Sequence, residues 1–289
     1  MQIHLVDGTY ELFRHFYAVP SSLAPDGREV GAARGVLASL IALLRDGATH
    51  IGCAFDTRVE SFRNDLFAGY KTGAGIEPAL LGQFELVEAG VRALGITAWS
   101  MVEFEADDAL ATAAVRCAAD PRVERVLLCT PDKDLGQSVA GTRIVQLDRR
   151  KDTVLDEAGV CAKFGVPPRA IPDLLALVGD PQDGIPGVPK WGAKSAAAVL
   201  ARWGELAKIP ADPAEWDCAV RGAASLAASL NEHREAAALY RTLATLRTDV
   251  PIAEDVDDLR WRGPTAAFGD LCASIGAERL VSRVPAPRP

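Results

Sequence analysis

The sequence predicts an α/β fold with a mostly parallel central sheet, followed by a region made only of helices. As far as about residue 155, short apolar runs alternate with segments of helical spacing, and beyond that point only helical spacing remains. A chain of 289 residues, 49% of them hydrophobic, is also long enough to bury a large core.

The predicted strands are short runs rich in β-branched and other apolar residues, as expected for strands that are covered on both faces. In chain order they are Ile3–Val6, His50–Phe55, Ile96–Met101, Arg125–Cys129 and Thr142–Leu147. Because helical segments separate most of them, the strands are expected to run parallel.

The predicted helices place apolar residues three and four apart, which is the spacing of an amphipathic helix. Those of the first part are Gly35–Leu44, Leu80–Leu94 and Ala109–Ala118. Those of the second part are Ile171–Val178, Ala193–Trp203, Ala214–Leu230 and Glu232–Leu246, with a loop at Pro210–Pro213. We therefore expect an α/β domain over residues 1–155, a helical region over 156–283 and a loose, proline-rich tail at 284–289.

The composition excludes several classes of protein. No apolar run approaches the roughly 20 residues of a membrane helix, and the N-terminus lacks the features of a signal peptide, so a cytoplasmic location is expected. Six dispersed cysteines and four scattered histidines argue against a zinc site or a Ser-His-Asp triad. The net charge of −8 argues against a phosphate-rich partner, but leaving nine clustered carboxylates out of the count changes it to +1. Divalent cations would neutralise such a cluster.

Three predicted strands lead into an aspartate, at Asp7, Asp56 and Asp132. Functional groups of parallel sheets gather outside the carboxyl ends of the strands. Each aspartate alone could simply cap a helix or a turn, whereas three together favour one shared site.

Two more acidic groups follow the same pattern. Glu105, Asp107 and Asp108 open a predicted helix, where acids complement the helix dipole, but three of them repel unless a cation lies among them. Asp134 completes an Asp-x-Asp pair with Asp132, which is either a metal-binding pair or an ordinary solvated turn.

A last acidic pair lies in a loop rich in proline and glycine. A predicted helix ends at Gly179, Asp180 and Asp183 follow it, and Lys194 lies in the first turn of the next helix. Small residues before that helix would let backbone N–H groups approach a phosphate. A plain helix–loop–helix turn is the alternative, but it does not by itself require two aspartates.

Nine carboxylates with few histidines suit hard divalent cations such as Mg²⁺ or Mn²⁺. Two such ions about 4 Å apart can activate a water and stabilise the leaving oxygen of a phosphodiester. A haloacid-dehalogenase-like phosphatase, with Asp132 and Asp134 as nucleophile and acid, is the alternative, and it would leave Asp180 and Asp183 without a role.

Five motifs occur in one order along the chain: VDGTYELFRHFYA (Val6–Ala18), FDTRVESFRNDLFAGYK (Phe55–Lys71), FEADDALA (Phe104–Ala111), TPDKDLGQ (Thr130–Gln137) and GDPQDGIPGVPKWGAKSA (Gly179–Ala196). In these motifs the sequence resembles the 5′-3′ exonuclease domain of bacterial DNA polymerase I and related flap endonucleases, over roughly residues 1–280. The chain leaves no room for a polymerase domain, so it resembles a stand-alone form. The resemblance implies a PIN-like α/β domain with a helical arch, followed by a helix-3-turn-helix that binds DNA.

The resemblance also implies roles for individual residues. The tighter metal site would use Asp7, Asp56, Glu105, Asp107, Asp132 and Asp134, with Asp108 bound directly or through a water, and Asp180 and Asp183 would complete a second site. Arg63 and Lys71 would contact the scissile phosphate. Tyr10, Arg14 and Phe16 would lie near the bent duplex, while Gly187, Gly192, Lys194 and Ser195 would bind the duplex backbone and, as often in this family, a K⁺ ion.

The sequence departs from the family pattern in the arch and in the DNA-binding loop. Thr72–Val91 contains no Lys or Arg, although an arch usually supplies cations, and Ala74 stands where an arginine is frequent. Lys190-Trp191-Gly192 replaces the usual Gly-x-Gly, and Gly136 replaces a bulkier residue. None of these changes removes a predicted metal ligand.

The sequence is therefore expected to encode a metal-dependent 5′-3′ exonuclease and flap endonuclease of replication and repair. Its expected partner is DNA with a 5′ flap, a nick or a 5′ end, RNA-primed ends included. A monomer without membrane association is expected. The alternatives are a structured-DNA-binding protein with weak catalysis, suggested by the cation-poor arch, and a PIN-type ribonuclease.

Overall fold

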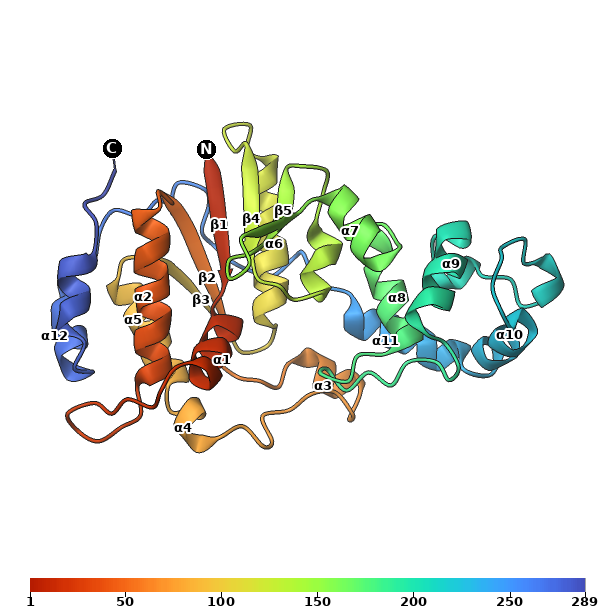
Figure 1. Cartoon of the computed structure of the whole chain (residues 1–289), viewed down its shortest axis with the longest axis horizontal. Helices are drawn as coiled ribbons and strands as arrows, with labels where there is room; N and C mark the ends of the chain where they lie inside the picture. The colour runs from red at the N-terminus through yellow and green to blue at the C-terminus, as the bar shows by residue number, and fades with distance from the viewer. Residues whose placement is uncertain (289) are drawn as a thin grey trace. The chain divides into compact units, whose positions relative to one another are not determined.

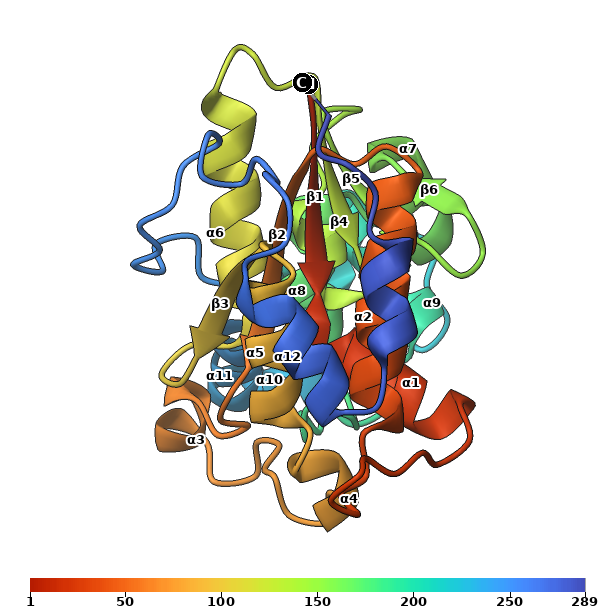
Figure 2. The same ribbon diagram turned by 90° about the vertical axis from the view of Figure 1, so that its left-hand side faces the viewer.

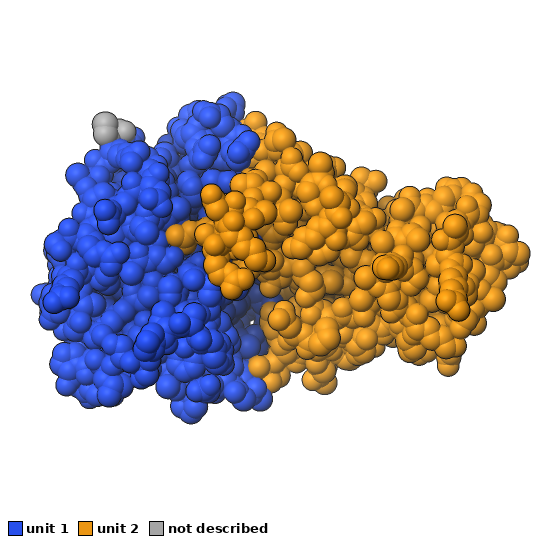
Figure 3. All heavy atoms as spheres, viewed as in Figure 1, with its two compact units in different colours: residues 1–61, 73–130, 248–289 blue, residues 62–72, 131–247 orange. Residues whose placement is uncertain are grey.

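The computed structural model describes residues 1–288, which divide into two compact units built from interleaved chain segments. Unit 1 comprises residues 1–61, 73–130 and 248–289, and unit 2 comprises residues 62–72 and 131–247 (Figure 3). The predicted domain limits at residues 155 and 283 stay a prediction.

The sheet of unit 1 contains four parallel strands in the order β3-β2-β1-β4. They are β1 (Gln2–Asp7), β2 (His50–Asp56), β3 (Thr97–Met101) and β4 (Arg125–Cys129). The prediction of a mostly parallel sheet is thus confirmed. Because β2 and β3 lie on one side of β1 and β4 on the other, the strand order reverses at β1. Such a reversal opens a crevice outside the carboxyl ends of the strands, where ligands of α/β proteins bind.

Helices cover both faces of this sheet (Figure 2). Helix α6 (Ala106–Ala119) packs on one face against all four strands. The opposite layer contains α1 (Gly8–Ala18), α2 (Gly31–Arg45), α5 (Phe84–Ala93) and α12 (Ala267–Ser274), followed by the 3₁₀ helix η5 (Glu278–Arg283). This division follows from right-handed crossovers, because the chain moves one way from β1 to β3 and returns the other way to β4.

The helix predicted at Leu80–Leu94 is divided into α4 (Pro78–Leu81) and α5. The break lies at Gln83, which is completely buried: its Oε1 accepts from the Ala33 N–H at 3.0 Å and its Nε2 donates to the Ala79 carbonyl at 3.0 Å. A buried amide that binds the backbone of two helices requires this local geometry, which helical spacing alone did not reveal.

Unit 2 is mostly helical (Figure 1). Its strands β5 (Ile144–Asp148) and β6 (Thr153–Leu155) form an antiparallel pair. Its α-helices are α3 (Phe62–Leu66), α7 (Glu157–Phe164), α8 (Ile171–Val178), α9 (Ala193–Trp203), α10 (Ala223–Glu232) and α11 (Arg234–Ala244). Its 3₁₀ helices are η1 (Asp134–Ser138), η2 (Pro168–Ala170), η3 (Leu206–Lys208) and η4 (Pro213–Glu215). Helix α8 packs against both α9 and α11, and the predicted bounds of α8 and α9 are confirmed.

Segment 62–72 belongs to the core of unit 2. Tyr70 is buried in its apolar cluster, and Phe67 packs edge-on against Tyr240 of α11, with ring centroids 5.9 Å apart. Within residues 62–83 the only helices are α3 and α4, so this part of the predicted arch contains no long helix. Across residues 1–288 no helix is both long and apolar enough to cross a bilayer.

The helix predicted at Ala214–Leu230 begins only at Ala223. Trp216 turns into the core instead, where its Nε1 donates to the Pro210 carbonyl at 3.0 Å, and Gly222 adopts a left-handed φ of +79°. The predicted loose tail has no helix or strand over residues 284–288, and Pro289 lies outside the described residues.

Candidate metal centre

The first predicted acid, Asp7, ends β1 and caps α1. One carboxylate oxygen accepts from the Tyr10 N–H at 2.8 Å, and the other accepts from the Thr130 hydroxyl at 3.0 Å. Thr130 directly follows β4, so this bond joins two neighbouring strands at the point where the strand order reverses. These two bonds therefore fix the direction of the Asp7 carboxylate at the carboxyl ends of the strands.

The second acid, Asp56, ends β2 and lies at the beginning of α6. Its Oδ1 accepts from the Ala106 N–H at 2.8 Å, and its own N–H donates to the Thr9 hydroxyl at 2.8 Å. The free N–H groups and the dipole of a helix N-terminus stabilise negative charge. Asp56, which is distant in sequence, thereby accepts from one of the free N–H groups at the beginning of α6.

Glu105 and Asp108 form the capping box of α6. The Glu105 N–H donates to the Asp108 carboxylate at 3.0 Å, and the Glu105 carboxylate accepts from the Ser61 hydroxyl at 2.7 Å. Asp108 is 0% exposed, whereas Asp107, beside it in the first turn, is partly exposed. Asp108 thus caps the beginning of α6, whereas Asp107 is not part of the capping box.

Unit 2 brings together three of the predicted ligands: Asp134, Asp180 and Asp183 offer carboxylate oxygens within 4.8 Å of one another. Within residues 1–288 this is the only group of three potential metal-ligating side chains this close. Asp180 is 2% exposed and Asp134 6% exposed. Burial raises the pKa of Asp134 well above its ordinary range, and the charges of Asp132 and Asp183 raise it further.

The Asp134 Oδ1 atom is buried and has no hydrogen-bond partner within the described chain. An unpaired, buried carboxylate oxygen is costly, and two further acids nearby increase the cost. A hard cation among these oxygens would remove both penalties. The donor set therefore fits a metal ion.

The loop after α8 turns Asp180 and Asp183 toward the same place. Asp180 and Ile185 exchange two backbone hydrogen bonds of 2.8 Å, which closes a tight turn around Asp183. Gly184 has a φ of +74°, and a Cβ atom there would lie 2.1 Å from the Gly69 carbonyl oxygen. Only glycine fits that position, so segment 62–72 packs directly on the loop that carries the two acids.

Two lysines pair with this cluster. Lys133 Nζ lies 2.6 Å from Asp180 Oδ2, and Lys71 Nζ lies 3.1 Å from Asp183 Oδ1. Burial alone would lower the pKa of Lys133, but the hydrogen bond to Asp180 and the surrounding acids outweigh it, so that pKa is raised. Lys133 was not among the predicted site residues, although its position between Asp132 and Asp134 already indicated one.

Arg63 has a different position from the one expected of a residue that contacts phosphate. It is 1% exposed, and its guanidinium donates to the Leu243 carbonyl at 2.8 Å and to the Thr245 carbonyl at 3.1 Å. In this structure Arg63 therefore binds the end of α11. Lys71, in contrast, is partly exposed beside Asp183.

The remaining predicted residues lie in two places. In the loop before α9, Ser195 Oγ caps the helix by accepting from the Gly192 N–H at 3.1 Å, Lys194 is exposed, and Lys190 adopts an unusual φ of +71°. In α1, Arg14 pairs with buried Glu11 at 2.6 Å, while Tyr10 and Phe16 are partly exposed. Gly187 is buried, with a φ of +74°.

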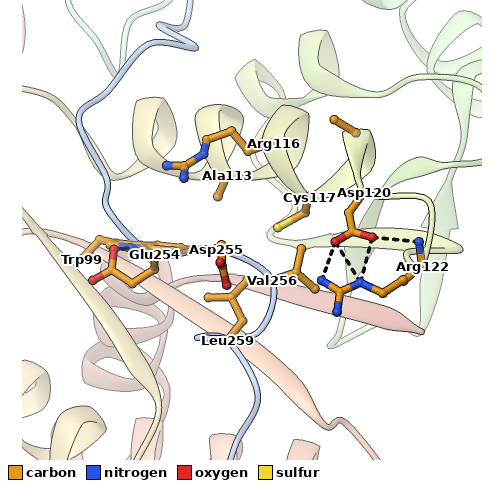
Figure 4. A pocket seen from close by; sticks show the side chains of 11 residues that line it. Trp99, Ala113, Arg116, Cys117, Asp120, Arg122, Glu254, Asp255, Val256 and Leu259 are labelled. Atoms are coloured by element: carbon orange, nitrogen blue, oxygen red, sulfur yellow. Dashed lines mark hydrogen bonds and ion pairs between the residues drawn. The ribbon is translucent and has the colours of Figure 1, made fainter.

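A pocket of about 320 Å³ lies elsewhere in unit 1, between β3, α6 and the segment around Glu254 (Figure 4). Trp99 Nε1 donates to Glu254 at 2.8 Å, and Arg122 pairs with Asp120 at 2.6 Å on its wall. It contains none of the predicted site residues. This pocket therefore lies apart from the predicted site.

Comparison with known families agrees with the motif order. The family model described as the N-terminal resolvase-like domain of 5′-3′ exonuclease matches residues 2–165, and the model of its C-terminal SAM fold matches residues 166–267.

Two curated relatives show the extent of the similarity. DNA polymerase I of Pseudomonas aeruginosa is 39% identical over 265 residues, which cover 88% of this chain and 28% of that protein. A 5′-3′ exonuclease of Buchnera aphidicola subsp. Baizongia pistaciae is 34% identical over 257 residues, which cover 86% of this chain and 82% of that protein. The chain thus spans little more than a quarter of the DNA polymerase I that it matches.

Solved structures share the fold. The bacteriophage T5 flap endonuclease in complex with DNA and metal ions has a TM-score of 0.67 at 16% identity, covering 98% of this chain and 97% of that chain. The T5 5′-exonuclease with bound zinc has a TM-score of 0.65 at 17% identity, with the same coverage. The catalytic core of Rad2 with a DNA substrate has a TM-score of 0.63 at 15% identity, covering 98% and 90%.

Proposed function

The chain belongs to the 5′-3′ exonuclease family, and on that premise we propose that it is a metal-dependent nuclease that hydrolyses DNA near 5′ ends and junctions. One observation carries the proposal: Asp134, Asp180 and Asp183 converge around an unpaired, buried oxygen, with Lys71 beside them. Three carboxylates without a histidine favour Mg²⁺ or Mn²⁺, two or more ions being expected. Asp7, Asp56, Glu105, Asp107 and Asp132 remain proposed ligands on the motif match.

In phosphodiester hydrolysis, different residues of unit 2 would bind the metal ions and contact the phosphate. When bound, divalent ions supply positive charge and lower the pKa of a water. Asp134, Asp180 and Asp183 would hold them, while Lys71 would donate to a non-bridging oxygen of the scissile phosphate as charge develops there. We assign this contact first to Lys71, because the Arg63 guanidinium also binds the end of α11; a contact of Arg63 with the phosphate stays a prediction.

DNA is the proposed partner, with a 5′ flap, a nick or an RNA-primed 5′ end as its form. The exposed Lys190 and Lys194 at the beginning of α9 support a contact with the duplex backbone, because a helix N-terminus and lysines attract phosphate. We also propose that a K⁺ ion binds at this loop, that the protein is a monomer and that it is cytoplasmic.

A cleavage assay tests this function. A duplex with a 5′-labelled flap is incubated with Mg²⁺, with Mn²⁺ or with EDTA, and with wild type, Asp183→Asn or Asp107→Ala. Exposed Glu215, outside the cluster, offers the matched control Glu215→Gln. We expect metal-dependent cleavage near the junction by wild type and control, and its loss in both site variants. No product with either metal, from folded wild-type protein, would refute the nuclease.

The same assay decides the weaker alternative. Thr72–Val91 contains no Lys or Arg, which favours a structured-DNA-binding protein of low activity. Such a protein would bind the flapped duplex in EDTA and leave it intact after Mg²⁺ is added. Release of mononucleotides only would keep the exonuclease and exclude the flap endonuclease.

A further inference from the structure

Two glutamines bind the backbone of the Asp132-Lys133-Asp134 turn. The first, Gln137 of η1, donates from Nε2 to the Asp134 carbonyl at 2.9 Å and to the Ala244 carbonyl at 2.9 Å. Its Oε1 accepts from the Leu246 N–H at 3.0 Å. One side-chain amide thus joins the turn that carries a predicted metal ligand to the chain at the end of α11.

The second glutamine, Gln146, lies in the middle of β5 and is 1% exposed. Its Nε2 donates to the Asp132 carbonyl, whereas its buried Oε1 has no hydrogen-bond partner among residues 1–288. Burying an unpaired amide oxygen costs stability, and an apolar residue would suit the strand better. Fold stability therefore does not account for this glutamine, but its bond to the turn does.

The end of α11 is a suitable anchor for such a restraint. The last carbonyls of a helix have no partner within the helix, and here the side chains of Arg63 and Gln137 bind them. Arg63 binds the carbonyls of Leu243 and Thr245 on either side of the one that Gln137 binds. Four consecutive residues, 243–246, are thereby fixed by two side chains.

A restraint on this turn has a physical purpose. The carboxylates of Asp134, Asp180 and Asp183 lie within 4.8 Å of one another, so their mutual repulsion would push Asp134 away before a cation binds. A backbone held at both carbonyls keeps the Asp134 side chain directed into the cluster. Groups that orient metal ligands in this way typically contribute about 10- to 100-fold to metal affinity or activity.

We propose that Gln137 and Gln146 are positioning residues of the metal centre, which fix the carbonyls of Asp134 and Asp132 so that the cluster is formed before the metal arrives. The part of this inference that concerns cleavage rests on the proposed nuclease function. The part that concerns metal affinity does not.

The test uses the full chain with Gln137→Met or Gln146→Met, because methionine has nearly the length of glutamine but neither its donors nor its acceptor. The matched control is Thr242→Ala: Thr242 is exposed on α11 and its hydroxyl donates only within that helix, to the Ala238 carbonyl at 3.0 Å. Three quantities are measured: the Kd for Mn²⁺ by titration calorimetry, the midpoint of thermal unfolding in EDTA, and the rate of cleavage of the labelled flap.

We expect the Kd for Mn²⁺ to rise about tenfold in each glutamine variant and to stay within about twofold in the control. The unfolding midpoint of Gln146→Met should stay close to that of wild type, because removal of the unpaired oxygen offsets loss of the bond to the Asp132 carbonyl. An unchanged Kd in folded Gln146→Met would overturn the inference, as would wild type that binds no Mn²⁺. If wild type binds Mn²⁺ without cleaving DNA, the nuclease proposal fails while the Kd values still decide this one.

Discussion

The acids of unit 1 cap helices, whereas those of unit 2 lie close together beside lysines. In unit 1, Asp7, Asp56 and Asp108 accept from backbone N–H groups at the beginnings of α1 and α6. In unit 2, Asp180 and Asp183 pair with lysines, and Asp134 keeps a buried oxygen without a partner in the described chain. The first group is built into secondary structure, whereas the second leaves negative charge to be balanced.

This difference separates stability from metal binding. Acids that cap helices contribute to folding whether or not a cation is present. Crowded acids with a raised pKa, such as Asp134, oppose folding until a cation binds. Removing a capping acid should therefore destabilise unit 1, whereas removing Asp134 should relieve unit 2, although both changes are expected to abolish cleavage.

The largest expected effect comes from comparing Asp134→Ala with Asp7→Ala. We expect both to reduce the cleavage rate by at least about 100-fold, because losing a ligand should cost at least as much as losing a group that only orients one. In EDTA, however, Asp7→Ala should lower the free energy of unfolding by about 1 kcal/mol through loss of its cap, and Asp134→Ala should leave it equal or higher. Urea unfolding measures this. Equal destabilisation by the two variants would break the comparison.

A second pair sharpens the comparison inside one helix. Asp108→Ala removes a completely buried capping group and should cost about 1–3 kcal/mol of stability. Asp107→Ala, one residue away and partly exposed, should change stability by no more than about 0.5 kcal/mol but abolish cleavage. Thermal unfolding and the flap assay give both values. If the two stabilities change alike, the separate roles are wrong.

A third variant, Lys133→Met, tests the balance of charge in unit 2. Without this lysine, buried Asp180 loses its cationic partner, so we expect about 2 kcal/mol less stability in EDTA. Saturating Mn²⁺ should restore most of that loss, making the metal-induced rise in the unfolding midpoint larger than in wild type. A rise equal to that of wild type would show that Lys133 does not balance the cluster.

The smallest effect concerns the loop before α9. Lys190 adopts a φ of +71°, which a side chain disfavours and glycine accepts, so Lys190→Gly should stabilise the chain by roughly 0.5–1 kcal/mol. Lys190→Ala keeps the strain while removing the charge, and it should not stabilise. Both variants remove the charge of Lys190, so any weakening of DNA binding should be the same in Lys190→Gly and Lys190→Ala. A binding titration at fixed salt measures the Kd for DNA of each variant.

Much of the fold could be predicted because local patterns are strong in this chain. Apolar runs predicted β1 to β4, and the spacing of apolar residues predicted α8 and α9 with their bounds. The predictions failed where a distant partner decided the local structure. Buried Gln83 divides one predicted helix, and Trp216 turns into the core where another was expected.

The sequence by itself determined which acids follow which strands and helices, because strand ends and helix starts are properties of neighbouring residues. Only the tertiary structure decided what each polar side chain binds. Arg63 reaches carbonyls 180 residues away, Gln137 reaches one 107 residues away, and Asp108 rather than Asp107 faces the helix start. Hydrogen bonds require positions and directions within a few tenths of an ångström, and packing sets these only after the chain has folded.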